Sequence, residues 1–126
     1  MAETEQITAD ERRTLSVLAF LFYRMGLEDR ARRVYAAIAE LSEPGSADYR
    51  FAKAGLAAVA VESGNGAEAL AELKDAMQGG PLSSKEATLH LLKAQALWQQ
   101  GRKAEAEQAR NTFLYLTGRT GKDNTQ

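Results

Sequence analysis

Few side chains in this sequence could carry out acid–base, metal or nucleophilic chemistry. The 126 residues contain no cysteine and a single histidine, His90, so disulfides, thiolate zinc sites and cysteine–histidine pairs are excluded. The sequence around His90 offers no acid–base partner. Glu105 and Glu107 fall on different faces of a helix, so they form no carboxylate pair. The sequence therefore predicts a protein that is not an enzyme and that holds no cofactor and no metal.

Phosphate, nucleic-acid and membrane binding lack a sequence signal as well. The turn Gly64-Asn65-Gly66 is not followed by the Gly-Lys-Ser/Thr of a phosphate loop. Sixteen Lys and Arg against 17 Asp and Glu give a net charge of −1, which gives no support for nucleic-acid binding. The longest apolar run, 57–61, is far short of a membrane span, and the acidic N-terminus does not resemble a secretion signal. We expect a cytoplasmic protein that binds another protein, with no nucleic acid and no membrane insertion.

The elements that must position any binding residues are helices. Apolar residues make up 44% of the chain, and its two prolines both stand beside a glycine. Apolar positions recur at helical spacing and predict helices at about 9–25, 28–42, 47–63, 66–78, 84–100 and 103–117. Thr8-x-x-Glu11 and Ser83-x-x-Glu86 have capping-box spacing, and Ser46 is a candidate N-cap. The apolar stripe of the first helix contains Leu15, Leu18, Ala19 and Phe22, and that of the second contains Ala31, Val34, Tyr35, Ile38 and Leu41.

One short pattern occurs three times, in order, between pairs of predicted helices. Each copy has a glycine followed five residues later by an alanine. Glycine can end a helix in the left-handed conformation, and a small residue one turn into the next helix lets the two backbones approach closely. The pattern predicts three helical hairpins with turns at Gly26/Ala31, Gly64/Ala69 and Gly101/Ala106.

These residues resemble the tetratricopeptide repeat, a 34-residue pair of helices. Of the three units, the second matches the repeat best, and its matching residues are Leu56, Ala57, Gly64, Ala69, Ala76 and Pro81. The resemblance implies an all-α fold in which three hairpins (about 9–42, 47–78 and 84–117) stack in a right-handed superhelical array, an α-solenoid. The predicted organisation is one domain at 9–117, an N-terminal tail at 1–8 and a disordered C-terminal tail at 118–126. A bundle of six antiparallel helices is the alternative.

The resemblance also implies a binding surface, because the first helix of each such hairpin lines the inner face of the array. Large apolar side chains at these positions would form an exposed patch unless a partner filled it, and packing between the helices is the alternative. The groove positions carried over from the family are Arg13, Ser16, Phe20, Tyr23 and Arg24 in the first unit, Phe51, Ala54, Ala58 and Val61 in the second, and Leu91, Gln95 and Trp98 in the third.

In size and layout the chain is similar to the small tetratricopeptide chaperones of bacterial type III secretion systems, the class called SctY or YscY. This resemblance implies a cytoplasmic chaperone that holds a helical or extended apolar segment of a small secreted partner, SctX-like, and presents it to the export gate. The alternatives are a chaperone for the needle subunit or the translocators and a general scaffold or assembly factor. Without its partner the chain could form a homodimer through the same groove.

Overall fold

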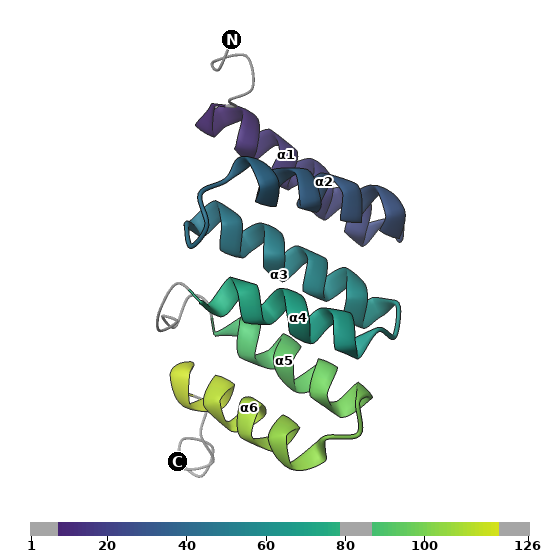
Figure 1. Cartoon of the computed structure of the whole chain (residues 1–126), viewed down its shortest axis with the longest axis vertical. Helices are drawn as coiled ribbons and strands as arrows, with labels where there is room; N and C mark the ends of the chain where they lie inside the picture. Colours follow the sequence, from purple (N-terminus) through teal and green to yellow (C-terminus); the bar gives the residue numbers. More distant parts are fainter. Residues whose placement is uncertain (1–7, 79–86, 119–126) are drawn as a thin grey trace.

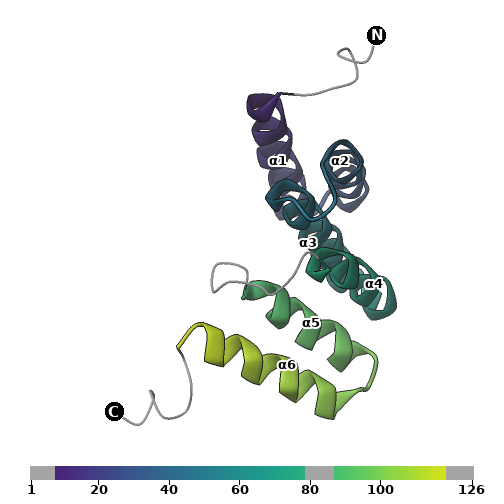
Figure 2. The ribbon, with the colours of Figure 1, turned by 60° about the vertical axis from the view of Figure 1, so that its left-hand side comes forward.

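The computed structural model describes residues 8–78 and 87–118, and these residues form six α-helices. The helices are α1 (Ala9–Arg24), α2 (Glu28–Leu41), α3 (Ala47–Glu62), α4 (Gly66–Met77), α5 (Thr88–Gln99) and α6 (Lys103–Leu116). They follow one another along the long axis of the molecule, with α1 at one end and α6 at the other (Figures 1 and 2). Each packs mainly on its neighbours in the sequence, and α3 also touches α1 and α5. The predicted all-α class is confirmed, and the packing is consistent with three helical hairpins.

The start of α1 is fixed by the predicted capping box. The Thr8 hydroxyl accepts a hydrogen bond from the N–H of Glu11 at 3.1 Å, and the Glu11 carboxylate accepts one from the N–H of Thr8 at 2.8 Å. Ser46 caps α3 in a similar way, because its hydroxyl accepts the N–H of Tyr49 at 3.1 Å. These caps satisfy N–H groups that the first turn of a helix leaves without a partner.

Some predictions fall on parts of the chain that lie outside the described residues. These are the start of the fifth helix at residue 84, its capping box at Ser83 and Glu86, the tail before residue 8 and the tail after residue 118. The other predicted helix ends agree closely with the structure.

Three turns share one backbone geometry. Gly26, Gly64 and Gly101 have φ angles of 78°, 77° and 76°, in the left-handed region that favours glycine. Each glycine N–H donates to the carbonyl three residues earlier, at 3.0–3.1 Å, and the next N–H donates to the carbonyl five residues before it, at 2.8–2.9 Å. This pair of bonds ends one helix and turns the chain into the next. The predicted repetition of glycine-centred turns is therefore confirmed.

The alanine five residues after each glycine lies in the contact between the two helices. Ala31 and Ala69 are fully buried, and Ala106 is 5% exposed. Because the turns are alike, residues of different hairpins can be compared by their distance in sequence from the turn glycine. Residues at the same distance are called equivalent below.

In the first two hairpins, a large side chain of the second helix packs on the hairpin that follows. Tyr35 of α2 is buried with its ring over Gly55 of α3, where a Cβ atom would overlap the ring. The equivalent residue of α4, Leu73, is also buried and packs in one cluster with Leu89 of α5. These two junctions hold the three hairpins in a row.

Two residues of the predicted apolar stripes are exposed: Leu18 is 39% exposed and Leu41 is 43% exposed. The periodicity marks an apolar face but does not indicate whether a neighbouring element covers it. Both belong to the first hairpin, which no described hairpin precedes.

Candidate functional site

The tryptophan on the last turn of α5 is uncovered. Trp98, the only tryptophan of the chain, is 61% exposed. Its equivalents Tyr23 and Val61 are half-buried, because the Tyr23 hydroxyl lies within hydrogen-bonding reach of the Glu62 carboxylate on α3, and Val61 packs beside α5. In each case the first helix of the next hairpin provides cover. No described helix follows α6, so Trp98 lacks it.

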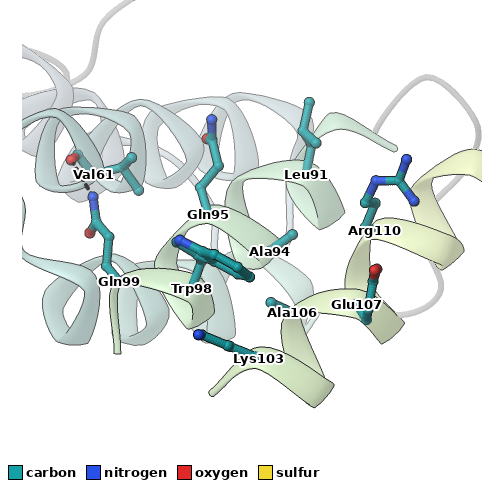
Figure 3. Close-up of a pocket in the computed structure, with 10 residues that line it drawn as sticks. All are labelled: Val61, Leu91, Ala94, Gln95, Trp98, Gln99, Lys103, Ala106, Glu107 and Arg110. Carbon is teal, nitrogen blue, oxygen red and sulfur yellow. Dashed lines mark hydrogen bonds between the residues drawn. The ribbon is translucent and has the colours of Figure 1, made fainter. Parts of the chain in front are cut away.

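Trp98 forms one wall of an apolar pocket of about 470 Å³. The pocket lies between α5 and α6, with Val61 of α3 at one side (Figure 3). Ala94 and Ala106 are buried where α5 meets α6, and their short side chains leave the space that larger residues would fill. The lining residues are Val61, Leu91, Ala94, Gln95, Trp98, Gln99, Lys103, Ala106, Glu107 and Arg110.

Contacts at the helix ends fix this pocket against the rest of the row. The Gln99 side-chain amide donates at 2.9 Å to the Val61 carbonyl, which also accepts the Gly64 N–H, so this bond ties the end of α5 to the turn after α3. Gly66, at the start of α4, is buried so close to α5 that a Cβ atom would stand 2.6 Å from the Ala96 carbonyl oxygen. The end of α5 is thus held by both helices of the second hairpin.

The charged groups at the pocket come from α6. The Lys103 ammonium lies 5.2 Å from the centre of the Trp98 ring, which is cation–π range. Within residues 8–78 and 87–118, neither Lys103 nor Arg110 forms an ion pair with a carboxylate. Glu107 supplies one negative charge at the same pocket. An apolar pocket beside two cations can take an apolar side chain together with a neighbouring carboxylate.

A second group of predicted residues lies on α1. Phe20 is 48% exposed, and its ring centre is 6.5 Å from that of Tyr23. The Arg24 guanidinium lies 6.0 Å from the Phe20 ring centre. Burial, followed by the neighbouring Glu62 carboxylate, raises the pKa of Tyr23 above its usual range. This phenol therefore stays neutral and can donate a hydrogen bond at any physiological pH.

The predicted residues of α3 form a third part of this surface. Phe51 is 43% exposed, and its ring centre is 5.8 Å from that of the buried Tyr35. Ala54 and Ala58 are half-buried. Phe51 therefore packs partly on α2 and keeps a large part of its surface in solvent.

The structure places the predicted groove residues in separate groups. The pocket gathers Val61, Leu91, Gln95 and Trp98. Phe20, Tyr23 and Arg24 form the group on α1, and Phe51 lies beside Tyr35. Of the remaining four, Ser16, Ala54 and Ala58 are half-buried, and the exposed Arg13 has its guanidinium 3.5 Å from the Asp10 carboxylate.

Sequence reasoning missed the α6 wall of the pocket, which consists of Lys103, Ala106, Glu107 and Arg110. It assigned binding to the first helix of each hairpin, and α6 is a second helix. In the first two hairpins, the second helix is covered by the next hairpin. The repeat pattern gave no signal for these residues, because it identifies second helices only by the alanine that packs at the turn.

The histidine lies in a different hollow. His90 shares it with Lys93 and with Glu105, whose carboxylate is held by the Arg102 guanidinium at 2.7 and 2.8 Å. Burial and then the Lys93 cation lower the pKa of His90 below its usual value. His90 is not among the residues that line the Trp98 pocket.

Two features of the described parts of the chain concern metal-binding clusters and helices that could span a membrane. Their His, Asp and Glu side chains form no group of three that could hold a metal ion. None of their helices has the length and apolar character needed to cross a bilayer. No family model matches the chain, and no curated protein matches it.

Proposed function

We propose that this protein binds another protein by taking an apolar helix of its partner into the Trp98 pocket. The observation that carries the proposal is the exposure of Trp98 beside an apolar pocket of about 470 Å³. Exposed aromatic side chains set in a pocket are typical anchors of protein interfaces. Burying such a surface gains about 25 cal/mol per Å² of apolar area, against which stands the cost of ordering the partner.

The equivalent positions of the other hairpins support a helix as the guest. Tyr23 and Val61, the equivalents of Trp98, are covered by α3 and α5, each the first helix of the following hairpin. A guest helix in the Trp98 pocket would take the corresponding place after the third hairpin. The backbone of such a helix satisfies its own hydrogen bonds, so it can lie in an apolar site without leaving polar groups unpaired.

Arg110 indicates which kind of charged residue the guest helix should carry. Its equivalents are Tyr35 and Leu73, which seal the first two junctions. A helix seated in the pocket would therefore meet a guanidinium where the other junctions have an apolar side chain. We infer that the guest carries an Asp or Glu beside its apolar anchor, because a buried guanidinium needs a carboxylate.

The broader identity rests on the tetratricopeptide resemblance. In this proposal the three hairpins form a right-handed superhelical array whose groove extends from the pocket towards Phe51 and Phe20. The protein is then a chaperone or adaptor, with binding rather than catalysis as its task. Its specific form is a cytoplasmic type III secretion chaperone for a small SctX-like partner, and its more general form is a scaffold or assembly factor.

Trp98 itself provides the test, because it is the only tryptophan and its emission reports on the pocket alone. A synthetic amphipathic helix of about five turns with an acidic residue beside a leucine should shift the emission to the blue and saturate. A scrambled peptide of equal charge should not. Trp98→Phe should remove the signal, and the binding of that variant can be followed by calorimetry.

A substitution in the pocket should also weaken partner binding without lowering the stability of the folded chain. Trp98→Ala should weaken binding at least about tenfold, as for an interface hot spot, with little change in melting temperature. Tyr115→Ala, an exposed aromatic on α6 outside the pocket, is the matched control and should bind normally. Equal losses of binding and stability in Trp98→Ala would mean that the side chain is part of the core, and the proposal would be wrong.

The secretion-specific form needs the native host. Mass spectrometry of the protein purified from that host should find a small secreted protein in equal amount, released by Trp98→Ala and retained by Tyr115→Ala. A partner that remains bound to Trp98→Ala would place the interaction elsewhere on the chain.

A further inference from the structure

A strip of apolar side chains on α1 faces outward at the N-terminal end of the row. Val17, Leu18, Leu21 and Met25 are 55%, 39%, 49% and 67% exposed, respectively. Their spacing puts them on one side of the helix, across from the fully buried Ala19. We call these four residues the outer strip.

Leu18 and Leu21 of the outer strip occupy positions at which other hairpins bury apolar side chains, whereas the equivalents of Met25, Ser63 and Gln100, are exposed. The equivalents of Leu18 and Leu21 on α3 are Leu56 and Val59, which are buried in one cluster with residues of α1 and α2. The equivalent of Leu21 on α5 is Ala96, buried in a cluster with residues of α3 and α4. The outer strip has the character of a junction surface, but no described hairpin precedes it.

The opposite end of the row is different. The exposed outward residues of α6 are small or polar, apart from one tyrosine: Ala104, Gln108, Asn111 and Tyr115. The equivalent residues of α2, Asp29, Arg33, Ala36 and Glu40, are also exposed, so this polar face is one that an inner hairpin exposes too. The apolar outer strip of α1 has no counterpart on it.

We propose that the outer strip binds a second copy of the same chain, with the two α1 helices packed antiparallel about a twofold axis. An apolar strip along one helix is complementary to itself in this arrangement. The acidic first turn of α1, with Asp10 and Glu11, then lies beside the basic last turn of the partner helix, which contains Arg24. The helix dipoles also oppose one another favourably. The Asp10 side chain is 92% exposed, so it can turn towards the partner.

A head-to-tail arrangement of two copies is less favourable. It would set α1 of one copy on α5 and α6 of the next, with Arg110 where Tyr35 and Leu73 stand in the inner junctions. The guanidinium would then face the apolar outer strip, which offers no carboxylate. Head-to-tail contacts also repeat without closing and produce filaments. The antiparallel pair closes on itself and leaves the Trp98 pocket open.

The available area sets the expected strength of the pair. The four side chains leave on the order of 400 Å² of apolar surface exposed, less than the about 800 Å² that each partner buries in a standard interface. The dimer should therefore be weak and dissociate on dilution.

Sedimentation equilibrium over a concentration series tests the proposal. The mass should rise from 13.7 kDa towards twice that value. Leu21→Glu should remain at 13.7 kDa at all concentrations, with unchanged helical circular dichroism. The matched control Tyr115→Glu places the same charge on the outward face of α6 and should dimerise as the native chain does. If Leu21→Glu is poorly folded, Val17→Ser provides the same test with a milder change.

The geometry can be tested separately, because the chain has no cysteine of its own. A spin label on Thr14→Cys should give a distance between the two copies within about one length of α1, about 24 Å, and a label on Gln108→Cys should give a longer one. Arg24→Asp should weaken the dimer several-fold, and Asp10→Arg in the same chain should restore it.

Several outcomes would overturn the proposal. A native chain that stays monomeric throughout would mean that something other than a second copy covers the outer strip. A dimer that survives Leu21→Glu but is lost in Trp98→Ala would place self-association at the pocket. A mass that keeps rising past the dimer would indicate head-to-tail contacts. A native chain that stays monomeric would leave the proposal that the Trp98 pocket binds a guest helix unaffected.

Discussion

The two ends of the helical row share a backbone and differ in where they expose apolar surface. At the α1 end the apolar side chains face outward along a single helix, as Leu21 and Met25 do. At the α6 end the outward face is largely polar, and the exposed apolar surface lies in a pocket between two helices, around Trp98. A flat apolar strip can pack against another flat strip, whereas a pocket can bind a side chain that inserts into it. The same hairpin geometry can therefore serve self-association at one end and guest binding at the other.

Equivalent positions explain how this difference arises. The turns at Gly26 and Gly101 have nearly the same φ angle and the same two hydrogen bonds, so they set up the same helix crossing at both ends. What differs is the neighbour. The first hairpin lacks a predecessor and the third lacks a successor among the described helices, so each end exposes the side that an inner hairpin buries.

The largest expected effect tests whether the α1 end is open. Ile38→Ala removes a fully buried side chain of α2 and should cost about 2–5 kcal/mol of unfolding free energy. Leu41→Ala, on the same helix but 43% exposed, should cost less than about 1 kcal/mol. Urea denaturation followed by circular dichroism measures both at low protein concentration, where the chain is a monomer. Similar losses for the two variants would mean that the end of the first hairpin is covered.

The next effect tests whether the two end turns are truly alike. Gly26→Ala and Gly101→Ala each force a residue with a Cβ atom into the left-handed region, where no other atom lies within 4 Å of that Cβ. Each should therefore cost the strain of the backbone alone, about 1–2 kcal/mol. Melting temperatures of the two variants should fall by similar amounts. A large difference between the two losses would show that one turn contributes more to stability than the shared backbone geometry explains.

Sequence reasoning recovered the turns because a glycine and an alanine have local causes for their positions. The left-handed φ at Gly64 and the tight contact at Ala69 depend on the chain within a few residues, so the pattern revealed both. The exposure of Leu18 depends instead on whether another hairpin exists on that side. No pattern within one helix contains that information.

The candidate site was recovered in part for the same reason. Trp98 and Leu91 stand at positions that their own helix makes inward and unpaired, so the repeat pattern could identify them. Arg110 and Lys103 line the pocket only because α6 is the last described helix of the row. The comparison of the repeats assigned binding to the first helix of each hairpin, so it did not include these two residues of α6.

A smaller effect sharpens the chemistry of the pocket end. Arg110→Glu should weaken the binding of an acidic guest helix about tenfold, because it reverses the charge that pairs with the guest carboxylate. Glu107→Gln removes the one negative group of the pocket and should slightly strengthen the binding of the same guest helix. Calorimetric titration at two salt concentrations measures both, and the difference should shrink at high salt. If Arg110→Glu binds the acidic guest as well as the native chain, the inferred carboxylate is not part of recognition.

The smallest expected effect uses the single histidine as a reporter of the third hairpin. Burial and then Lys93 lower the pKa of His90 in the folded chain below its usual 6.5. The unfolded chain therefore binds more protons than the folded chain once the pH falls below about 6.5, and stability decreases until the pH passes the folded pKa. His90→Gln should reduce the fall in melting temperature between neutral and mildly acidic pH. Hydrogen exchange should place the acid-sensitive amides in α5 and α6, and equal acid sensitivity of α1 and α2 would mean that the two ends do not differ in this respect.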